Sequence, residues 1–354
     1  MPLSFAFIRA CYLDDILAAA GEALPWEELR ERNILVTGAT GLIGSCLVDV
    51  LMAHGDINVY AAGRNEERAR ARFVEYADNP RFHFFKYDVS KPLSCDEALV
   101  FHYIIHAASD ASPAAFASSP VDVIKSNIYG TANLIEYGMA HSMRRFLYVS
   151  TGEVYGEGGA TENTPDGPAF IETDSGYVNP TLSRSCYPSS KRTAETLCAA
   201  YKEQYGVDVV IARPCHTYGP HFTSSDNRVY AQFIRNVLRG EDIVMKSDGS
   251  QFRSWCYVVD CVRALLYILL KGESGEAYNI ADSNSNVTIR QLADMIASAA
   301  GRKVVIQLPP DSESKGYNRV TRSLFSTRKL EALGWSITGN MSDKLARTVE
   351  NAHI

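Results

Sequence analysis

Short apolar runs alternate with longer amphipathic segments from residue 33 to residue 213. The apolar runs have the length and composition of buried strands: 34–36, 59–62, 82–85, 103–105, 146–149 and 209–211. Between them, apolar residues recur at helical spacing in four longer segments: 42–54, 65–77, 120–141 and 188–205. This alternation is typical of a doubly wound parallel sheet, so the pattern predicts an α/β, Rossmann-type domain over 33–213.

The two ends of the chain depart from this alternation. Apolar residues at helical spacing between Ile8 and Ala20, and a helix-start pattern at 25–28, predict a helical N-terminal extension over 1–32. Beyond residue 213 the runs become shorter and less regular. We expect residues 214–354 to form mainly a smaller C-terminal lobe that binds substrate, with some segments crossing between the two lobes.

Composition and charge exclude several classes of protein. At 354 residues the chain is long enough for one large α/β domain or a two-lobed enzyme. Its 46% hydrophobic and 21% charged residues are ordinary for a globular protein, and the net charge of −6 gives no sign of a nucleic-acid surface. Nowhere do about 18 apolar residues run together, so neither a membrane span nor a membrane partner is expected.

The cysteines and the first residues bear on the cellular compartment. None of the eight cysteines lies in a C-x-x-C pair or a dense cluster, which argues against a disulfide scaffold or a zinc site, so we expect no metal. Near the N-terminus, Asp14 and Asp15 interrupt a short apolar patch, and no small-residue cleavage site follows. These features favour a protein of the reducing cytoplasm.

A glycine-rich loop follows the first apolar run. Gly38 and Gly41 allow a tight turn and a close approach of the backbone to a pyrophosphate, and Gly44 allows the next helix to pack closely on the strand. The N-terminus of that helix offers oriented amides to negative charge. The loop therefore predicts a nicotinamide dinucleotide site with these contacts: Gly38, Thr40, Gly41, Leu42, Ile43 and Gly44.

The end of the second apolar run bears on which dinucleotide is bound. An acid is usual there when a free ribose 2′-hydroxyl is recognised, but Gly63 stands in its place. Arg64 follows and is suited to a 2′-phosphate, unless it is simply an exposed arginine at a helix start. By itself this feature favours NADP. The other expected cofactor contacts follow the third and fourth runs: Asp88, Val89, Ala107, Ala108 and Ser109.

Tyr187 and Lys191 are the leading candidates for catalysis. They lie one helical turn apart, on the same face of the predicted helix. An ammonium beside a phenol favours the phenolate, which lets tyrosine act as a base at working pH. Ser150 and Thr151 follow the fifth apolar run, at the carboxyl edge of the sheet, where ligands of open α/β folds bind. Together these residues indicate hydride-transfer chemistry.

These motifs resemble the extended short-chain dehydrogenase/reductase superfamily, and within it the NAD-dependent epimerase/dehydratase family. The resemblance runs over nearly all the chain from Asn33. Residues 212–220 are similar to the R-x-x-N-x-Y-G-P segment of the nucleotide-sugar branch, and residues 253–260 to its R-x-F-x-Y-V-x-D segment.

The resemblance implies a cycle of oxidation and reduction on a nucleoside-diphosphate sugar. Bound NAD(P)+ oxidises C4 of a hexose or hexuronic acid, chemistry follows on the ketone, and the hydride returns. Tyr187 would take the proton of the C4 hydroxyl, Lys191 would lower the pKa of Tyr187 and hold the nicotinamide ribose, and Thr151 would hydrogen-bond the same sugar hydroxyl. A helix that carries these residues by chance is the alternative explanation.

Residues 152 and 153 bear on the type of reaction. Dehydratases of the branch have Asp-Glu there and glucuronate decarboxylases have Ser-Glu, whereas this chain has Gly152 and Glu153. The aspartate of a dehydratase protonates the departing hydroxyl, so Gly152 argues against elimination of water. The resemblance implies UDP-glucuronate-type decarboxylation, with a 4-epimerase as the alternative, then a 4,6-dehydratase, and a non-catalytic nucleotide-sensing protein as a remote possibility. Arg253 and Glu153 would orient the sugar and relay protons, although a structural role for Glu153 stays open.

Departures from the decarboxylase pattern loosen the transfer of substrate identity. His216 replaces an asparagine and Ser326 stands where an aspartate is common. His216 either contacts the substrate or is a satisfied pocket histidine, and the arginines either bind the diphosphate or are solvated charges. The expected substrate contacts are Ser150, His216, Arg228, Arg253 and Arg322.

Cofactor choice and oligomeric state follow from the same resemblance. The decarboxylase comparison favours NAD, to which we lean over NADP because a cofactor recycled without release is little constrained by cellular pools. Relatives commonly dimerise through the helix of Tyr187 and the helix before it, so we expect a homodimer. The apolar residues expected to serve it are Val121, Ile124, Ile128, Leu134 and Ile135.

Overall fold

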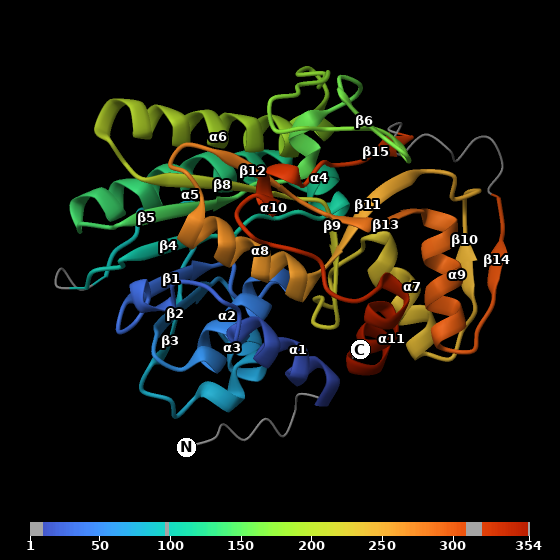
Figure 1. The fold of residues 1–354 in the computed structure, drawn as a ribbon, viewed down its shortest axis with the longest axis horizontal. Coiled ribbons are helices and arrows are strands. Elements are labelled where there is room, and N and C mark those ends of the chain that lie inside the picture. The colour runs from blue at the N-terminus through green and yellow to red at the C-terminus, as the bar shows by residue number, and fades with distance from the viewer. Residues whose placement is uncertain (1–9, 96–98, 309–320, 353–354) are drawn as a thin grey trace.

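A seven-stranded parallel sheet forms the centre of the molecule (Figure 1). The structure, a computed structural model, describes residues 10–95, 99–308 and 321–352. The strand order is β12, β8, β5, β4, β1, β2, β3. The strands span β1 (Asn33–Thr37), β2 (Asn58–Gly63), β3 (Phe82–Lys86), β4 (Tyr103–His106), β5 (Arg145–Val149), β8 (Val209–Pro214) and β12 (Ala277–Ile280). From β1 the chain adds strands on one side of the sheet up to β3, and from β4 it adds them on the other side. This reversal of strand order between β1 and β4 confirms the predicted doubly wound α/β fold.

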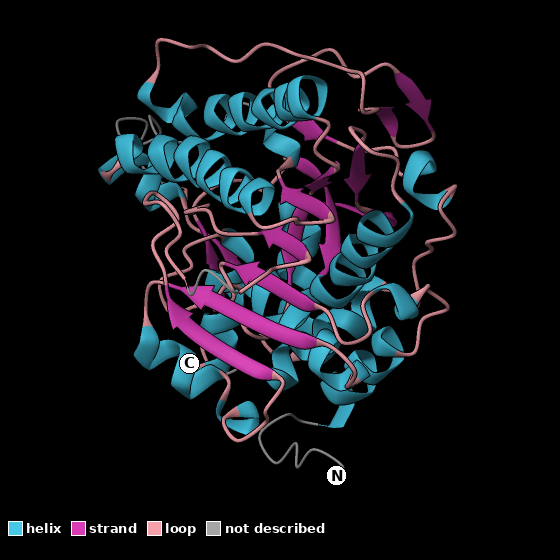
Figure 2. Ribbon diagram, turned by 90° about the vertical axis from the view of Figure 1, so that its left-hand side faces the viewer, coloured by secondary structure: helices cyan, strands magenta, loops and turns pink. Residues whose placement is uncertain are grey.

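Helices cover both faces of this sheet (Figures 1 and 2). One face carries α2 (Leu42–His54) and α8 (Val258–Lys271), with α1 (Ala10–Ala20) packed against these two helices, and the other face carries α5 (Pro120–Ala140) and α6 (Cys186–Tyr205). Side chains alternate between the two faces along a strand. In β1, Ile34 and Val36 join the core under α2, whereas Leu35 joins the core under α5.

All six predicted apolar runs form strands of the sheet, but other predictions need correction. The expected helix start at 25–28 is only a 3₁₀ turn, Trp26–Glu28, and Ile8 lies outside the described residues. The segment 65–77 forms a short helix, α3 (Glu66–Arg72), followed by a 3₁₀ turn at Val74–Tyr76. The seventh strand, β12, was not predicted, because it comes from the irregular C-terminal part.

The C-terminal part also builds a smaller sheet beside the carboxyl edge of the central one. Its order is β13, β11, β15, with β9 paired to the other end of β11. The elements are β9 (His216–Tyr218), α7 (Val229–Leu238), β10 (Ile243–Met245), β11 (Phe252–Tyr257), β13 (Asp282–Thr288), α9 (Ile289–Ala299), β14 (Val304–Ile306), β15 (Arg322–Ser323), α10 (Arg328–Glu331) and α11 (Met341–Asn351). The remaining elements are α4 (Pro113–Ser118) and the hairpin of β6 (Glu162–Thr164) and β7 (Gly167–Ala169).

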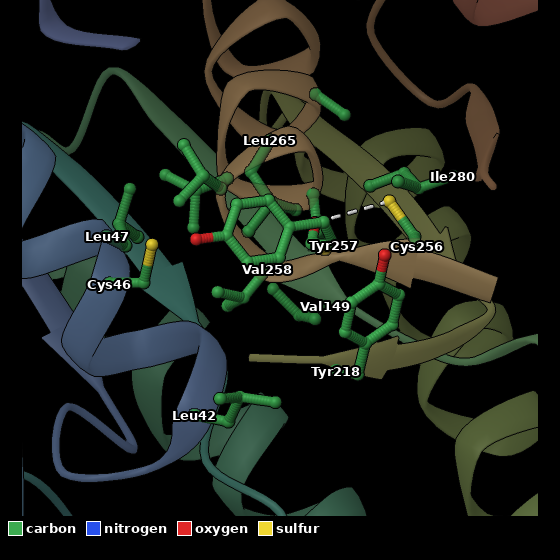
Figure 3. Packing of buried hydrophobic residues seen from close by; sticks show 14 of the residues in the cluster. Leu42, Cys46, Leu47, Val149, Tyr218, Cys256, Tyr257, Val258, Leu265 and Ile280 are labelled. Carbon is green, nitrogen blue, oxygen red and sulfur yellow. Dashed lines mark hydrogen bonds between the residues drawn. The ribbon is translucent and has the colours of Figure 1, made fainter. Parts of the chain in front are cut away.

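Packing in the hydrophobic core fixes the position of the N-terminus of α2. Leu42 and Leu47 of α2 belong to the same buried cluster as Val258 and Leu265 of α8 (Figure 3). Leu42 is the first residue of α2, so this packing positions the glycine-rich loop that precedes it. Of the described residues, none forms a helix long and apolar enough to cross a bilayer.

Charged side chains tie α1 to the C-terminal helices. The carboxylate of Asp15 accepts a hydrogen bond from the hydroxyl of Tyr257 at 3.1 Å and pairs with Arg347 of α11. The carboxylate of Glu22 lies 2.6 Å from the guanidinium of Arg263 in α8, and both side chains are largely buried. The N-terminal segment is therefore joined to the rest of the fold by paired charges as well as by apolar packing.

Candidate active site

Close packing of the backbone requires glycine at two positions of the glycine-rich loop. Gly38 has φ +68°, and a Cβ there would lie 2.7 Å from the carbonyl oxygen of Ala107 and from the backbone of Ala108. A Cβ on Gly44 would lie 2.3 Å from the carbonyl oxygen of Gly38. Neither position accepts a side chain, so the loop brings the ends of β1 and β4 together.

The same loop fits the pyrophosphate of a dinucleotide. Gly41 caps α2 without a side-chain hydrogen bond, so no side chain caps the first amides of this 13-residue helix. A Cβ at Gly41 would meet only the carbonyl oxygen of Gly38, at 3.2 Å, and would otherwise point into open space. Uncapped amides beside open space at a helix N-terminus suit an anion.

The other predicted cofactor contacts lie at different depths along this edge. The side chain of Thr40 stands between the loop and Gly63, while Leu42 and Ile43 pack into the core, so their backbones are the groups facing the loop. Val89 is buried, and its carbonyl accepts from Asn133. The carboxylate of Asp88 is exposed and accepts from the hydroxyl and amide of its neighbour Ser90.

Arg64 and Asp110 form an ion pair at the same edge. The guanidinium of Arg64 lies 3.6 Å from the carboxylate of Asp110, with side chains 71% and 40% exposed. Asp110 was not singled out in the sequence. The predicted pairing of Arg64 with a 2′-phosphate must therefore compete with a carboxylate already in place.

Tyr187 and Lys191 lie on the buried face of α6. The ring of Tyr187 stacks on Phe116 with centroids 4.8 Å apart. The ammonium of Lys191 donates to the carbonyl of Val149 at 2.8 Å, and it lies 4.7 Å from the ring centroid of Tyr148. Helix α6 is thus attached to the end of β5, immediately before Ser150 and Thr151.

The pKa values in this pair differ from the expectation. Burial raises the pKa of Tyr187 above its ordinary value, the Glu153 carboxylate raises it further, and the hydroxyl of Thr151 lowers it. Burial lowers the pKa of Lys191 to about 7. The predicted lowering of the Tyr187 pKa by Lys191 is not seen, because the ammonium is turned toward Val149 and desolvation is the largest effect on both groups.

Glu153 lies in a 3₁₀ turn that follows β5. The turn spans Gly152–Tyr155, and the hydroxyl of Thr151 accepts from the amide of Glu153 at 3.2 Å. The carboxylate of Glu153 pairs with the guanidinium of Arg184 at 3.2 Å. Arg184 also lies over the ring of Phe116, 4.6 Å from its centroid. Sequence reasoning missed Arg184, although its place three residues before Tyr187 was a signal that it lies near the site.

Gly152 is held against an aromatic ring. A Cβ at Gly152 would lie 2.4 Å from a ring carbon of Phe325, so a side chain there requires Phe325 to move. Phe325 is buried, and its amide donates to the hydroxyl of Ser254 at 3.2 Å. Phe170 pairs with the same segment through a hydrogen bond to the carbonyl of Leu324. No local sequence pattern links Phe325 with Gly152, and the sequence analysis did not find it.

Two of the predicted substrate residues interact electrostatically with Glu153 and Tyr187. Arg253 is buried, which lowers its pKa to about 10, while the nearby Glu153 carboxylate raises it. The guanidinium of Arg228 pairs with the carboxylate of Asp226 at 2.6 Å, and its charge lowers the pKa of Tyr187. The charges of these arginines therefore act on Glu153 and Tyr187, two of the predicted catalytic residues.

His216, Ser150 and Arg322 have less direct relations to this set. The imidazole of His216 is solvent-accessible and packs beside Trp255, yet the surrounding protein, then Arg253 and Arg228, lower its pKa to about 3, so it is neutral. The Ser150 hydroxyl is buried and has no hydrogen-bond partner among the described residues. Arg322 is exposed and lies over Phe252, apart from the Glu153 ion pair.

A chain of hydrogen bonds joins the loop after β4 to helix α6 through α5. The hydroxyl of Ser109 donates to the amide oxygen of Asn127 at 2.7 Å, and the amide nitrogen of Asn127 donates to the hydroxyl of Ser190 at 2.9 Å. Asn127 is fully buried in α5. Its position among the apolar residues of a predicted core-facing helix was the available signal, and the sequence analysis did not use it.

Comparison with known proteins identifies the family. The profile of the NAD dependent epimerase/dehydratase family matches residues 34–281. UDP-glucuronic acid decarboxylase 2 of Arabidopsis thaliana is 35% identical over 329 residues, which is 92% of this chain and 69% of that protein. UDP-glucuronic acid decarboxylase 1 of Danio rerio is 33% identical over 326 residues, 91% of this chain and 73% of that protein.

Solved structures give the same result. A dTDP-glucose 4,6-dehydratase of Streptomyces venezuelae with NAD bound has a TM-score of 0.74 and 26% identity, over 90% of this chain and 96% of that one. A UDP-glucose 4-epimerase of Thermotoga maritima with UDP-glucose has a TM-score of 0.71 and 26% identity, over 90% of this chain and 98% of that one. The resemblance expected from the motifs is confirmed, and the chain belongs to the NAD-dependent epimerase/dehydratase family.

Proposed function

We propose that the protein decarboxylates a nucleoside-diphosphate hexuronic acid, with UDP-glucuronate as the first candidate substrate. The observation that carries this proposal is the contact between Gly152 and Phe325 beside Glu153. The turn has the glutamate that decarboxylases and dehydratases of the branch share, whereas the ring of Phe325 occupies the space of a side chain at position 152. The acid that elimination of water requires is therefore absent, and so is the serine of the decarboxylase pattern, but loss of carbon dioxide from a β-keto acid needs no acid at that position. The similarity to UDP-glucuronic acid decarboxylases supports the same substrate.

The residues around Tyr187 suit oxidation of a sugar hydroxyl. When bound, a nicotinamide cofactor supplies a hydride acceptor for C4 and returns the hydride at the end of the cycle. Tyr187 takes the proton of the C4 hydroxyl, and Thr151 hydrogen-bonds the same oxygen. Because burial and Glu153 raise the pKa of Tyr187, positive charge must reach the phenol before it acts as a base. Lys191, beside the end of β5, is the nearest ammonium on α6 to supply it.

The groups around Glu153 suit a substrate that carries a carboxylate. Once C4 is a ketone, the carboxylate on C5 belongs to a β-keto acid, which loses carbon dioxide without a strong base, and C5 then needs a proton. Arg184 lies at the Glu153 carboxylate and about half of its side chain is exposed, so it is placed to pair with the substrate carboxylate. Arg253, which also interacts with the charge of Glu153, offsets the remaining negative charge. In this scheme Arg184 selects a hexuronic acid over a neutral hexose.

NAD is the cofactor we propose. Gly63 lacks the acid that usually reads the 2′-hydroxyl, but the carboxylate of Asp110 beside Arg64 would repel a 2′-phosphate. Structures similar to this chain contain NAD. Mass spectrometry of the nucleotide released from the denatured protein distinguishes the two cofactors, and NADP as the released nucleotide would refute this choice.

A homodimer through α5 and α6 is proposed on the evidence of exposed apolar side chains. Val121, Ile124, Tyr129 and Met139 of α5 are each 39–59% exposed. Two residues expected to contribute, Leu134 and Ile135, are instead fully buried inside the subunit. Light scattering of the protein and of a Val121→Arg variant tests the dimer, because a buried arginine on this face would dissociate it. A monomeric parent protein would contradict the proposal.

The substrate is tested by supplying UDP-glucuronate, UDP-glucose and dTDP-glucose separately to the purified protein. We expect a UDP-pentose from UDP-glucuronate only, and no activity in the Tyr187→Phe variant. A 4-epimerase, favoured by the similarity to the Thermotoga maritima enzyme, would instead interconvert UDP-glucose and its C4 epimer. A dehydratase would give a 4-keto-6-deoxy sugar with its alkaline absorbance, and either result would overturn decarboxylation.

A further inference from the structure

Arg64 and Asp110 come from strands on opposite sides of β1. Arg64 follows the last residue of β2, and Asp110 follows β4 by four residues. Both β2 and β4 pair with β1, which ends at Thr37. Neighbouring strands are about 4.8 Å apart, so the two side chains meet across a span of about 10 Å. The ion pair therefore crosses the carboxyl edge of the sheet above the end of β1.

The glycine-rich loop lies under this crossing. It begins at Gly38, directly after β1, and a Cβ on Gly38 would lie 2.7 Å from the backbone of Ala107 and Ala108, so the loop packs closely on the residues after β4. On the other side the amide of Ala39 donates to the carbonyl of Ala62 in β2 at 3.1 Å. The loop is thus joined to both neighbouring strands. Because both side chains of the Arg64–Asp110 pair are exposed, we expect them on the solvent side of a dinucleotide seated on this loop.

Both ends of the ion pair are anchored by their neighbours. The side chain of Asn65 caps α3 by accepting from the amide of Arg68 at 2.8 Å, and the carbonyl of Gly63 accepts from the amide of Tyr87. On the other strand, the hydroxyl of Ser109 donates to Asn127 of α5. Only the two side chains have to move for the pair to open.

We propose that Arg64 and Asp110 form a clasp across the cofactor site that slows release of the bound dinucleotide. The proposal rests on the cofactor-binding part of the proposed function, but not on the identity of the sugar. An enzyme that oxidises and then reduces the same sugar has no net redox change, so a cofactor held between turnovers needs no exchange with solution. An ion pair that spans the site on its solvent side would help to retain the cofactor between turnovers.

The size of the effect follows from the exposure of the pair. Exposed ion pairs contribute little, and we expect their loss to speed release about two- to fivefold. Salt screens exposed charges, so the difference from the parent protein should shrink between low and high ionic strength. Arg64→Met and Asp110→Asn should have similar effects, and the double variant should add little to either, because both remove the same contact.

The test measures retention of NAD without any sugar substrate. The parent protein and the three variants are loaded with NAD, passed over a desalting column at low and high salt, and assayed over time for nucleotide that stays bound. Arg290→Met is the matched control, because it removes an exposed arginine–carboxylate pair on α9, with the Arg290 guanidinium 3.0 Å from Asp294. Circular dichroism reports whether each variant is folded.

Equal and non-additive loss of retention in Arg64→Met and Asp110→Asn, with the control unchanged, is the expected result. Faster release from Arg64→Met alone would overturn the clasp and indicate that Arg64 binds the cofactor directly. Retention equal to that of the control in both variants would also overturn it. Because no sugar is present, failure of the clasp and failure of decarboxylation are separate outcomes.

Discussion

The guanidinium of Arg184 lies 3.2 Å from the carboxylate of Glu153, and this ion pair joins the turn after β5 to the residues before α6. Half of the arginine side chain is exposed, so the pair is open to exchange with a ligand carboxylate. Two carboxylates next to one another would repel. A hexuronic acid beside Glu153 therefore requires a cation such as Arg184.

Replacing Arg184 should affect the acidic substrate selectively. We expect Arg184→Met to raise KM for UDP-glucuronate about tenfold or more, the usual cost of one charge-assisted hydrogen bond. Binding of UDP-glucose, measured as competitive inhibition, should change little, because a neutral sugar makes no such contact. Arg290→Met serves as the control. Equal weakening of both ligands would mean that Arg184 binds the nucleotide and not the carboxylate.

The contact between Gly152 and Phe325 predicts a strong thermodynamic coupling. Gly152→Ala should destabilise the protein by about 1–3 kcal/mol through overpacking. Phe325→Ala should cost about 3–5 kcal/mol through the cavity it leaves. The double variant should cost less than the sum of the two, because the smaller side chain at 325 accommodates the new methyl group. Urea unfolding measures all four proteins, and additive effects would show that the two residues do not compete for the same space.

Lys191 predicts a pH-dependent stability. Its pKa is lowered by burial from 10.5 to about 7, so between about pH 7 and 10 the unfolded chain binds more protons than the folded one. Stability from this group therefore rises as pH rises through that window, and its full cost is present below about pH 7. Lys191→Met should be inactive, yet its unfolding free energy should rise less than that of the parent protein between pH 7 and 9.

The control for that experiment is Lys303→Met, which removes an exposed lysine. It should leave the pH dependence of the parent protein unchanged. Parallel stability curves for Lys191→Met and the parent protein would mean that the ammonium of Lys191 keeps an ordinary pKa in the folded state.

The N-terminal segment should contribute measurably to stability. Glu22→Gln removes the charge that pairs with the buried guanidinium of Arg263, which keeps Asp260 as a second partner at 3.0 Å. We expect a loss of about 1–3 kcal/mol in the free energy of unfolding. Glu27→Gln, at an exposed position of the same segment, is the control. Equal stability of the two variants would mean that the ion pair of Glu22 with Arg263 adds nothing to the attachment of this segment.

Much of the central sheet was predictable because its information is local. Residues 42–54 match α2, and the apolar runs match six of the seven strands. Each of these elements can be recognised from the spacing of apolar residues within its own segment. The strand β12 was missed, because nothing in its four residues assigns it to a sheet formed mainly by the first two thirds of the chain. Glycines 38, 41 and 44 were equally readable, because their spacing and context are contiguous.

The relations that define the candidate site were less accessible. The Glu153–Arg184 pair, the Gly152–Phe325 contact and the Arg64–Asp110 pair each join residues from different elements. The pattern of residues along the sequence does not show which residues of different elements come into contact. Sequence reasoning identified Gly152 as unusual, but only the packing of Phe325 gives the physical reason why a larger residue is absent.

The most direct test of decarboxylation follows the carboxyl carbon itself. UDP-glucuronate labelled with ¹³C at the carboxylate is incubated with the protein and its bound cofactor, and the reaction is followed by ¹³C NMR in a sealed tube. The account predicts that the carboxylate signal is replaced by labelled carbon dioxide and bicarbonate, with an equal amount of UDP-pentose, and that Tyr187→Phe gives neither. Retention of the label in a sugar product by the parent protein would contradict it.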